Sequence, residues 1–337
     1  MQNRPTLRDV SQLSCLSIKT VSRVINAEPG VAPGTAARVR KAIAQLGYQP
    51  NLLARSLRVG RDNAIGLIVG SINDPFFAEV TAAVEETVQK RGCFVLIASS
   101  GESADREHQL VSGLLHRQVS GIIVVPSAQD QSYVEGRLGG VPIVFVDRPP
   151  SGMEADTVIV DNKDGARTGT SHLIAHGHTS IAFVGGPLGS YTACMRQAGF
   201  ELALEQAGAE PRPDLVRNAT MTVEDAEKEV AVLLGLSDPP TAIFAGNTRA
   251  ALGVVKALHA LGRTDVAMVS FDDFQTAEAL VPAVTVIRQD ASAIGHNAGE
   301  LLFQRLDGDS RPPRCVSVPT TLVQRGSGEL PFHRREA

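Results

Sequence analysis

The first fifty residues place apolar side chains at helical spacing in three short groups. Thr6, with Asp9 three residues later, forms a capping box that predicts a first helix ending at about Leu13. Ser17 is a second candidate N-cap and opens a helix over 18–25. Two short helices joined by roughly three residues form a helix-turn-helix.

A third helix is predicted between Pro33, which suits a first helical turn, and Leu46, with Gly47 as the residue that ends it. In this arrangement the apolar positions of the three segments face one another. The expected three-helix core consists of Leu7, Val10, Leu16, Val21, Val24, Val39, Ile43 and Leu46.

Beyond residue 61 the chain alternates short apolar runs with segments of helical periodicity. The runs are 65–70, 94–99, 121–126, 143–147, 158–161, 181–186, 242–246, 267–271 and 284–288. The helical segments are 76–91, 103–118, 163–176, 191–208, 223–236, 248–262 and 290–306. Continuous Val/Ile runs separated by helices predict parallel sheets covered on both faces. Because nine or more strands exceed one comfortable sheet, we expect a doubly wound α/β body in two similar lobes.

Charge divides the chain where the pattern changes. Residues 1–60 hold nine Lys or Arg and two acids, a net charge of +7, whereas the remainder carries −11. A short basic segment before an acidic body suggests a nucleic-acid-binding module. No apolar run approaches the roughly 18 residues of a membrane span, and MQNRPTLRDV is no secretory signal. Four cysteines without CxxC spacing fit a reduced, cytoplasmic protein.

In a helix-turn-helix, the start of the second helix enters the major groove of DNA. Ile18, Lys19 and Arg23 then point at base edges, where Arg can bind guanine bidentately and Ile can touch a thymine methyl. Phosphates lie within reach of Ser17, Thr20, Ser22 and Asn26. The pattern alone leaves open a three-helix bundle whose charges are only solvated.

Three motifs follow one another in the N-terminal segment: TVSRVIN, the LGYQPN junction and ARSLR. In these motifs the chain resembles the headpiece of the lactose-repressor (LacI/GalR) family. The resemblance implies that 51–58 is a hinge helix inserted into the minor groove, with Leu57 as the wedge that opens a base step and Ala54 beside it. The DNA-binding residues expected are Thr6, Ser17, Ile18, Lys19, Thr20, Ser22, Arg23, Asn26, Asn51, Ala54, Arg55 and Leu57.

The turn between the first two helices departs from that family pattern. Ser14-Cys15 stands where the family usually has Ala-Gly. A left-handed conformation at Cys15 costs roughly 1 kcal/mol relative to glycine. We therefore expect a headpiece that is less stable than usual, or a turn that is slightly re-aimed.

The acidic body carries further motifs, NDPFF, VDRPP, VDNKDGA, HLIAHGH, IAFVGG, AIFAGN, SFDD and VTVIRQD. They resemble the family's effector-binding core, which is similar to periplasmic sugar-binding proteins and holds a ligand between two lobes. The resemblance implies that the chain crosses between the lobes near Asp161, Asp290 and Pro319, before a last strand over 322–325.

The expected organisation follows from these boundaries. A helix-turn-helix domain covers 1–50, a hinge helix and linker cover 51–61, the effector-binding core covers 62–330, and a tail covers 331–337. Within the core, lobe 1 takes about 62–161 and 291–319, and lobe 2 takes about 162–290 and 320–330.

Strand ends in such folds deliver polar groups to the cleft. For any single acid after a strand, a helix cap or turn former is the simpler interpretation, but here five polar residues match the family's ligand-contacting positions, and two phenylalanines match its aromatic pair. The effector-binding residues expected are Phe76, Phe77, Asp147, Arg196, Asn247, Asp272 and Gln289. Two departures bear on the ligand: Thr248 stands where an acid commonly follows the Asn, and Cys194 stands where Arg or Glu is common.

His172, His176 and His178 form an HxxxHxH pattern, and two histidines at i,i+4 can bind zinc. Gly177 resembles a helix C-cap, and histidine near a helix C-terminus suits the dipole, so a structural role is favoured. No catalytic constellation is found, and we expect no enzymatic activity, metal or cofactor. The tail lacks the leucine heptads that make tetramers of some relatives, which favours a homodimer.

These features predict a transcriptional repressor that binds a pseudo-palindromic operator as a dimer. A small polyhydroxylated effector, such as a neutral sugar, would close the two lobes and change whether the hinge helices can pair. The alternatives are a solute-binding protein of a sugar transport system and an enzyme with a DNA-binding appendage. The basic headpiece argues against the first, and the missing catalytic constellation argues against the second.

Overall fold

The computed structural model describes residues 5–25, 29–48, 63–218 and 220–332. The chain divides into two compact units, Met1–Asp62 and Asn63–Ala337. The expected hinge over 51–61 lies outside the described residues, and so do the candidate DNA-binding residues Asn26, Asn51, Ala54, Arg55 and Leu57. Within the described ranges, no helix is both long enough and apolar enough to cross a membrane.

The N-terminal unit contains the three predicted helices, α1 (Leu7–Ser14), α2 (Ile18–Ile25) and α3 (Pro33–Leu46). The capping box of α1 is present, since Thr6 and Asp9 each accept a hydrogen bond from the other's backbone N–H. Ser17 Oγ accepts from the backbone N–H of Thr20 at 3.1 Å at the start of α2. Gly47 ends α3 in a left-handed conformation with φ of 60°. The helix-turn-helix prediction is confirmed.

The eight residues predicted for the headpiece core all belong to its apolar cluster, in which Val10, Val21 and Val39 are fully buried. The turn between α1 and α2 has the strained geometry that the sequence suggested. Cys15 caps α1 with φ of 50° and ψ of 42°, in the left-handed region. Arg38 from α3 donates to the carbonyl oxygen of Ser14 at 2.7 Å and ties this turn to the third helix.

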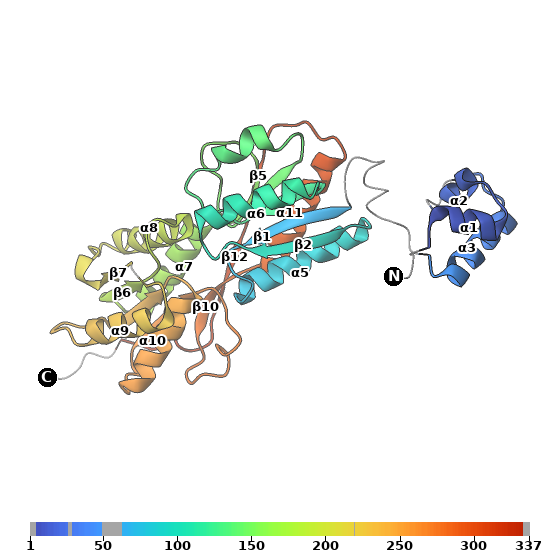
Figure 1. The fold of residues 1–337 in the computed structure, drawn as a ribbon. Coiled ribbons are helices and arrows are strands. Elements are labelled where there is room, and N and C mark those ends of the chain that lie inside the picture. The colour runs from blue at the N-terminus through green and yellow to red at the C-terminus, as the bar shows by residue number, and fades with distance from the viewer. Residues whose placement is uncertain (1–4, 26–28, 49–62, 219, 333–337) are drawn as a thin grey trace. The chain divides into compact units, whose positions relative to one another are not determined.

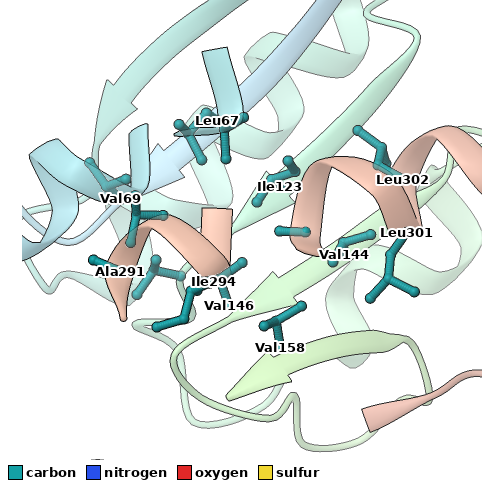
Figure 2. Packing of buried hydrophobic residues seen from close by; sticks show 14 of the residues in the cluster. Leu67, Val69, Ile123, Val144, Val146, Val158, Ala291, Ile294, Leu301 and Leu302 are labelled. Atoms are coloured by element: carbon teal, nitrogen blue, oxygen red, sulfur yellow. The ribbon is translucent and has the colours of Figure 1, made fainter. Parts of the chain in front are cut away.

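The first lobe of the second unit is built on a six-stranded parallel sheet. Its strands are β1 (Ala64–Val69), β2 (Phe94–Ser99), β3 (Gly121–Val124), β4 (Ile143–Val146), β5 (Asp156–Val160) and β11 (Cys315–Val318), in the order β11-β5-β4-β3-β1-β2. Helices α5 (Pro75–Lys90) and α11 (Ala291–Leu306) cover one face, and α6 (Ala104–His116) covers the other. Figure 2 shows how Val144 and Val146 of β4 meet Ile294 and Leu301 of α11.

The second lobe repeats this layout with a second sheet. Its strands are β6 (Ile181–Val184), β7 (Val216–Arg217), β8 (Ala242–Ala245), β9 (Ala267–Phe271), β10 (Thr285–Gln289) and β12 (Thr320–Val323), in the order β12-β10-β9-β8-β6-β7. Helices α7 (Asn162–Ala175) and α8 (Tyr191–Gln206) pack on one face, and α9 (Val223–Leu234) and α10 (Thr248–Ala260) pack on the other.

The chain crosses between the two sheets three times, from β5 to α7, from β10 to α11, and from β11 to β12 (Figure 1). Three connecting segments therefore join the two lobes. Short 3₁₀ helices, η1 (Ser132–Arg137) and η2 (Pro213–Leu215), lie in the loops. The expected two-lobed α/β core is confirmed.

Four details of the strand prediction were wrong. The last strand begins at Thr320 rather than at 322, and it pairs antiparallel with β10, so the second sheet is not purely parallel. The strands β11 and β7 were not predicted. β11 is an edge strand whose Cys315 and Ser317 are exposed, so it forms no apolar run, and β7 has only two residues.

Candidate functional site

The outward face of α2 is the candidate DNA surface of the headpiece. Ile18 and Lys19 are exposed, whereas Val21, on the opposite side of the same helix, is fully buried. This division presents the first turn of α2 to solvent while the helix remains anchored by the core. Arg23 Nη2 donates to the carbonyl oxygen of Pro29 at 2.7 Å, so this side chain also supports the segment that leads to α3.

The two hydroxyls at the start of α2 are engaged with each other. Ser17 Oγ and Thr20 Oγ1 lie 2.8 Å apart, within the N-terminal cap of the helix. Thr6 has the corresponding place at α1. These three residues therefore order helix N-termini, which are also the places where backbone N–H groups are free to bind phosphate.

The second unit contains a cleft of about 930 Å³ between the N-terminus of α5 on the first lobe and the strand ends of the second lobe. Its lining includes Phe76, Asp272 and Gln289, three of the residues that the sequence indicated. The other lining residues are Pro75, Glu79, Asp273, Phe274, Gln275, Glu278, Arg288, Asp290, Ala291, Thr321 and Arg325.

Asp147 and Asp272 occupy equivalent places in the two lobes. Asp147 follows β4 and Asp272 follows β9, and each of these strands is the third from the β11 or β12 edge of its sheet. Both aspartates have a left-handed backbone, with φ of 72° and 76°. The N–H of Asp147 donates to Val158 of β5, and that of Asp272 donates to Ile287 of β10, both at 2.9 Å. Non-glycine residues in this conformation cost energy and concentrate at ligand sites.

Arg196 is the central cation of the second lobe and is 5% exposed. Its Nε donates to Asn162 Oδ1 at 2.8 Å, and its Nη1 donates to the carbonyl oxygen of Gly246 and to Asp272 Oδ2 at 2.9 and 3.1 Å. Its guanidinium also lies 3.8 Å from the ring centroid of Phe271. This set of contacts fixes the guanidinium against the carboxylate of Asp272.

Gln289 completes the polar cluster of the second lobe. Its Nε2 donates to Asp272 Oδ1, while its Oε1 is buried and has no hydrogen-bond partner. Gln289 lines the cleft and is 9% exposed. An unpartnered acceptor at such a place costs free energy unless a ligand donates to it.

Asp147 brings a second buried carboxylate to the same region. Burial raises the pKa of its carboxyl, the charges of Arg148 and Arg196 oppose this rise, and the charge of Asp272 adds to it. Because these charges act on one another, the strand ends of both lobes converge on one polar cluster. The neighbouring Arg148 donates to Asp147 Oδ2 at 3.1 Å.

The two phenylalanines have different places. Phe76 is partly exposed and lines the cleft, whereas Phe77 is 5% exposed and packs in the core of the first lobe, so the structure leaves only Phe76 for a ligand. Asn247 caps α10 by accepting from the N–H of Ala250 at 2.9 Å, which is a structural use of that side chain. Cys194 Sγ lies 2.8 Å from the carbonyl oxygen of Leu188, the loop before its own helix.

Sequence reasoning missed Asp74, which caps α5 and accepts from the N–H of Phe76 at 3.0 Å. Burial raises the pKa of Asp74, and the charges of Asp272 and Asp147 add to this rise, so Asp74 is a third carboxylate near the cleft. The signal was present, since Asp followed by Pro75 is a typical start of a helix.

The histidine pattern is structural. His172 Nε2 and Glu329 Oε1 lie 2.5 Å apart, and His178 Nε2 lies 2.9 Å from the carbonyl oxygen of Leu330. Both contacts attach the C-terminal segment to the second lobe. Over the described part of the chain, no group of three or more His, Cys, Asp or Glu side chains is placed to hold a metal ion.

Comparisons with known proteins match both units. Residues 6–51 match the family described as bacterial regulatory proteins, lacI family, and residues 170–328 match the periplasmic binding protein-like domain. The PurR transcriptional repressor of Pasteurella multocida is 31% identical over 96% of this chain and 98% of its own length.

Solved structures agree with this assignment. The lac repressor dimer bound to operator and the anti-inducer ONPF is 28% identical, with a TM-score of 0.88 over 97% of this chain and 99% of that one. The complex of the transcriptional regulator CelR with cellobiose is 31% identical, with a TM-score of 0.71 over 96% and 100%. The chain belongs to the lacI family of bacterial regulatory proteins and is a ligand-controlled, DNA-binding transcriptional regulator.

Proposed function

We propose that this protein is a homodimeric repressor that acts in the cytoplasm and is controlled by a small, neutral, polyhydroxylated effector. The observation that carries the effector class is the cluster of acceptors between the lobes. Asp147 and Asp272 offer carboxylate oxygens, and Gln289 offers a buried Oε1 that lacks a donor. A ligand rich in hydroxyl groups supplies the donors that this cluster needs.

A sugar also suits the cation and the ring in the same region. Arg196 presents a rigid guanidinium that can donate to adjacent oxygens, and Phe76 offers an apolar surface to one face of a pyranose or furanose ring. The CelR relative was solved with cellobiose, which supports a carbohydrate.

The charges of the cleft disfavour an anionic ligand. Its lining contains five acids, Glu79, Asp272, Asp273, Glu278 and Asp290, against two arginines, Arg288 and Arg325. A phosphorylated sugar would bring further negative charge to a region that is already acidic. We therefore favour a neutral sugar or nucleoside-like polyol over a sugar phosphate.

On the DNA side, we propose that Ile18, Lys19 and Arg23 read base edges while the capped N-termini of α1 and α2 contact phosphates. Support comes from the outward face of α2 and from the basic charge of the N-terminal segment. The hinge over 51–58 and its wedge, Leu57, remain proposals from sequence.

The homodimer is supported by an exposed apolar edge on the first lobe. β2 is the edge strand of its sheet, and its Phe94 and Ile97 are 46% and 48% exposed. An edge strand with exposed apolar side chains is a site for pairing with another chain. The lac repressor neighbour is a dimer, and a second copy of this chain is the partner proposed here. Ile97→Glu should therefore yield a monomer in sedimentation experiments.

Fluorescence anisotropy tests the DNA-binding part. An operator is first selected from a random duplex library, and its affinity is compared with that of random DNA. Arg23→Ala should weaken operator binding far more than binding to random DNA, while Arg167→Ala on the second unit should change neither. Equal losses on both duplexes would overturn the role of Arg23 in reading bases.

Calorimetry tests the effector class with D-glucose, cellobiose, adenosine and glucose 6-phosphate. A neutral compound should bind and should change operator affinity. Tight binding to the phosphorylated sugar alone would overturn the proposed class without affecting the DNA-binding assignment.

A further inference from the structure

We propose that Arg148 is the positioning residue of Asp147: it holds the carboxylate in place, and Glu102 anchors it. This inference rests on the proposed function only where it assigns Asp147 to the effector. Neither Arg148 nor Glu102 was among the residues that the sequence indicated.

Arg148 contacts three loops that follow the C-terminal ends of strands in the first sheet. Its Nε donates to Asp147 Oδ2 at 3.1 Å, and its Nη1 donates to the carbonyl oxygen of Pro126, after β3, at 3.1 Å. Its guanidinium also donates twice to Glu102, after β2, at 2.9 and 3.3 Å. A guanidinium that is held on both sides has few orientations left, so it fixes the carboxylate that it contacts.

The backbone at both ends of this bridge is strained. Glu102 has φ of 60° and Asp147 has φ of 72°, and neither residue is glycine. Such conformations persist only where the surroundings compensate for them. Arg148 forms ion pairs with the side chains of both residues and so links the two strained positions.

Gly70 shows that the place of Glu102 is closely determined. A Cβ atom at Gly70 would overlap Glu102 Oε1 and would come within 3.1 Å of the ring of Phe77. The glycine at the end of β1 therefore allows Glu102 to reach Arg148. A side chain at this position would have to displace the anchor or the core phenylalanine.

The charges around Asp147 give Arg148 its effect. Burial raises the pKa of Asp147; Arg148 opposes the rise most among the charged groups, followed by Arg196 from α8, while Asp272 adds to it. Asp74 at the start of α5 interacts with the same group. Burial acts to lower the pKa of Arg148, but the charges of Asp147 and Glu102 outweigh it and raise the pKa, so the guanidinium stays charged.

The two oxygens of the Asp147 carboxylate therefore have different roles. Arg148 occupies Oδ2, which leaves Oδ1 for a donor from the effector. A carboxylate that is already held in one orientation can accept from a hydroxyl of the effector without further ordering.

The test uses the full-length, ligand-free protein, and it does not depend on knowing the effector. The protein is labelled with ¹³C at the aspartate carboxyl groups, and Asp147→Asn identifies the resonance of Asp147 by its disappearance. Its midpoint is then followed from about pH 3 to about pH 8. Arg148→Gln should move the midpoint to higher pH, Glu102→Gln should move it less, and Arg148→Lys should restore most of the original value.

Two further variants make the result specific. Arg325→Gln removes a similarly buried arginine that pairs with Asp273 in the second lobe, and it should leave the Asp147 midpoint unchanged. If Arg148→Gln does not fold, Gly70→Ala tests the same bridge by displacing Glu102, and it should raise the midpoint. An unchanged midpoint in the folded Arg148 or Gly70 variant would overturn the proposal, even if a neutral sugar is found to control operator binding.

Discussion

The two lobes have the same strand layout, yet they hold Asp147 and Asp272 by different means. In both sheets the strand that leads to the aspartate lies third from the β11 or β12 edge, and its neighbour accepts the aspartate's N–H. In the first lobe, Asp147 is paired with the next residue in the chain, Arg148. In the second lobe, Asp272 is paired with Arg196, which arrives from α8, and with Gln289 at the end of β10.

The backbone layout around the two aspartates is shared by the lobes, whereas the residues that pair with their carboxylates are not. The repeated layout accounts for a left-handed aspartate in both lobes, because each follows the strand at the same place in its sheet. The arginine that pairs with each aspartate comes from a different place in the two lobes. The residue after Asp147 is an arginine, whereas the residue after Asp272 is Asp273, which faces Arg325 instead. The second lobe therefore needs a distant arginine to neutralise its cleft carboxylate.

The largest expected effect follows from that distant arginine. Arg196→Ala leaves Asp272 without its cation and deprives Asn162 Oδ1 and the carbonyl oxygen of Gly246 of their donor. Removing one partner of a buried ion pair costs about 3–5 kcal/mol. Denaturant unfolding of the second unit should show this loss. Arg167→Ala, which breaks a pair with the exposed Asp164, should change stability by no more than about 0.5 kcal/mol.

A similar loss in both variants would mean that Arg196 contributes no more than a surface charge. The comparison between the lobes would then lose its basis. A loss confined to Arg196→Ala supports the view that the second lobe depends on a long-range cation.

The second prediction concerns effector affinity. Asp272→Ala should strand a hydroxyl of the effector and weaken its binding by about 1.5–3 kcal/mol, while operator binding is retained. In a repressor the variant should not respond to inducer. Asp147→Ala should show a loss of the same size if both lobes contribute equally. Calorimetry with the neutral sugar that binds the wild type measures both, and a loss in one lobe alone would show that the ligand is held asymmetrically.

Much of this fold was predictable because its strands are buried on both faces. All six residues of β1 are buried, so the strand forms a continuous apolar run, and the same holds for β4. The edge strand β11 escaped prediction because Cys315 and Ser317 face outward. The antiparallel pairing of β12 with β10 depends on the direction in which the chain enters the second sheet after its last crossing. The local sequence pattern does not indicate that direction.

The sequence indicated the site at strand ends and at positions that the family resemblance marked, such as Arg196 on α8. Asp147 and Asp272 were visible in this way, but the bridge to Glu102 depends on three loops that meet in space. Phe76 and Phe77 show a second limit of prediction from sequence. Neighbouring residues on a helix point about 100° apart, so only one of them can face the cleft, and the sequence does not say which.

The third prediction uses opposite pH dependences in the two lobes. Burial raises the pKa of Asp147, so the protonated form favours folding, and stability falls as pH rises from the ordinary value through the raised one. Burial also acts to raise the pKa of Asp273, but hydrogen bonds and charge from Arg325 outweigh it and lower the pKa. The stability from Asp273 is therefore present above the ordinary value and is lost as pH falls through the lowered one.

Thermal unfolding across pH measures this contrast. Asp147→Asn should stabilise the protein at neutral pH, and the gain should vanish in acid below the ordinary aspartate pKa of about 3.9. Asp273→Asn should destabilise it at neutral pH, with the loss shrinking in acid. If both variants shift stability in the same direction at neutral pH, the proposed difference in how the lobes hold their acids is wrong.

The smallest effect lies in the headpiece, where Cys15 is another non-glycine residue with a left-handed backbone. Cys15 caps α1 with φ of 50°, and Cys15→Gly should relieve the cost of that conformation and stabilise the headpiece by about 1 kcal/mol. The thiol is exposed and makes a weak contact with the carbonyl oxygen of Gln12 at 3.7 Å, so its loss should oppose the gain only slightly. Denaturant unfolding of the full chain, with a probe in the N-terminal unit, measures it, and Cys15→Ala is the matched control because it removes the thiol but keeps the Cβ. If alanine stabilises as much as glycine, loss of the thiol rather than relief of the backbone is responsible for the gain.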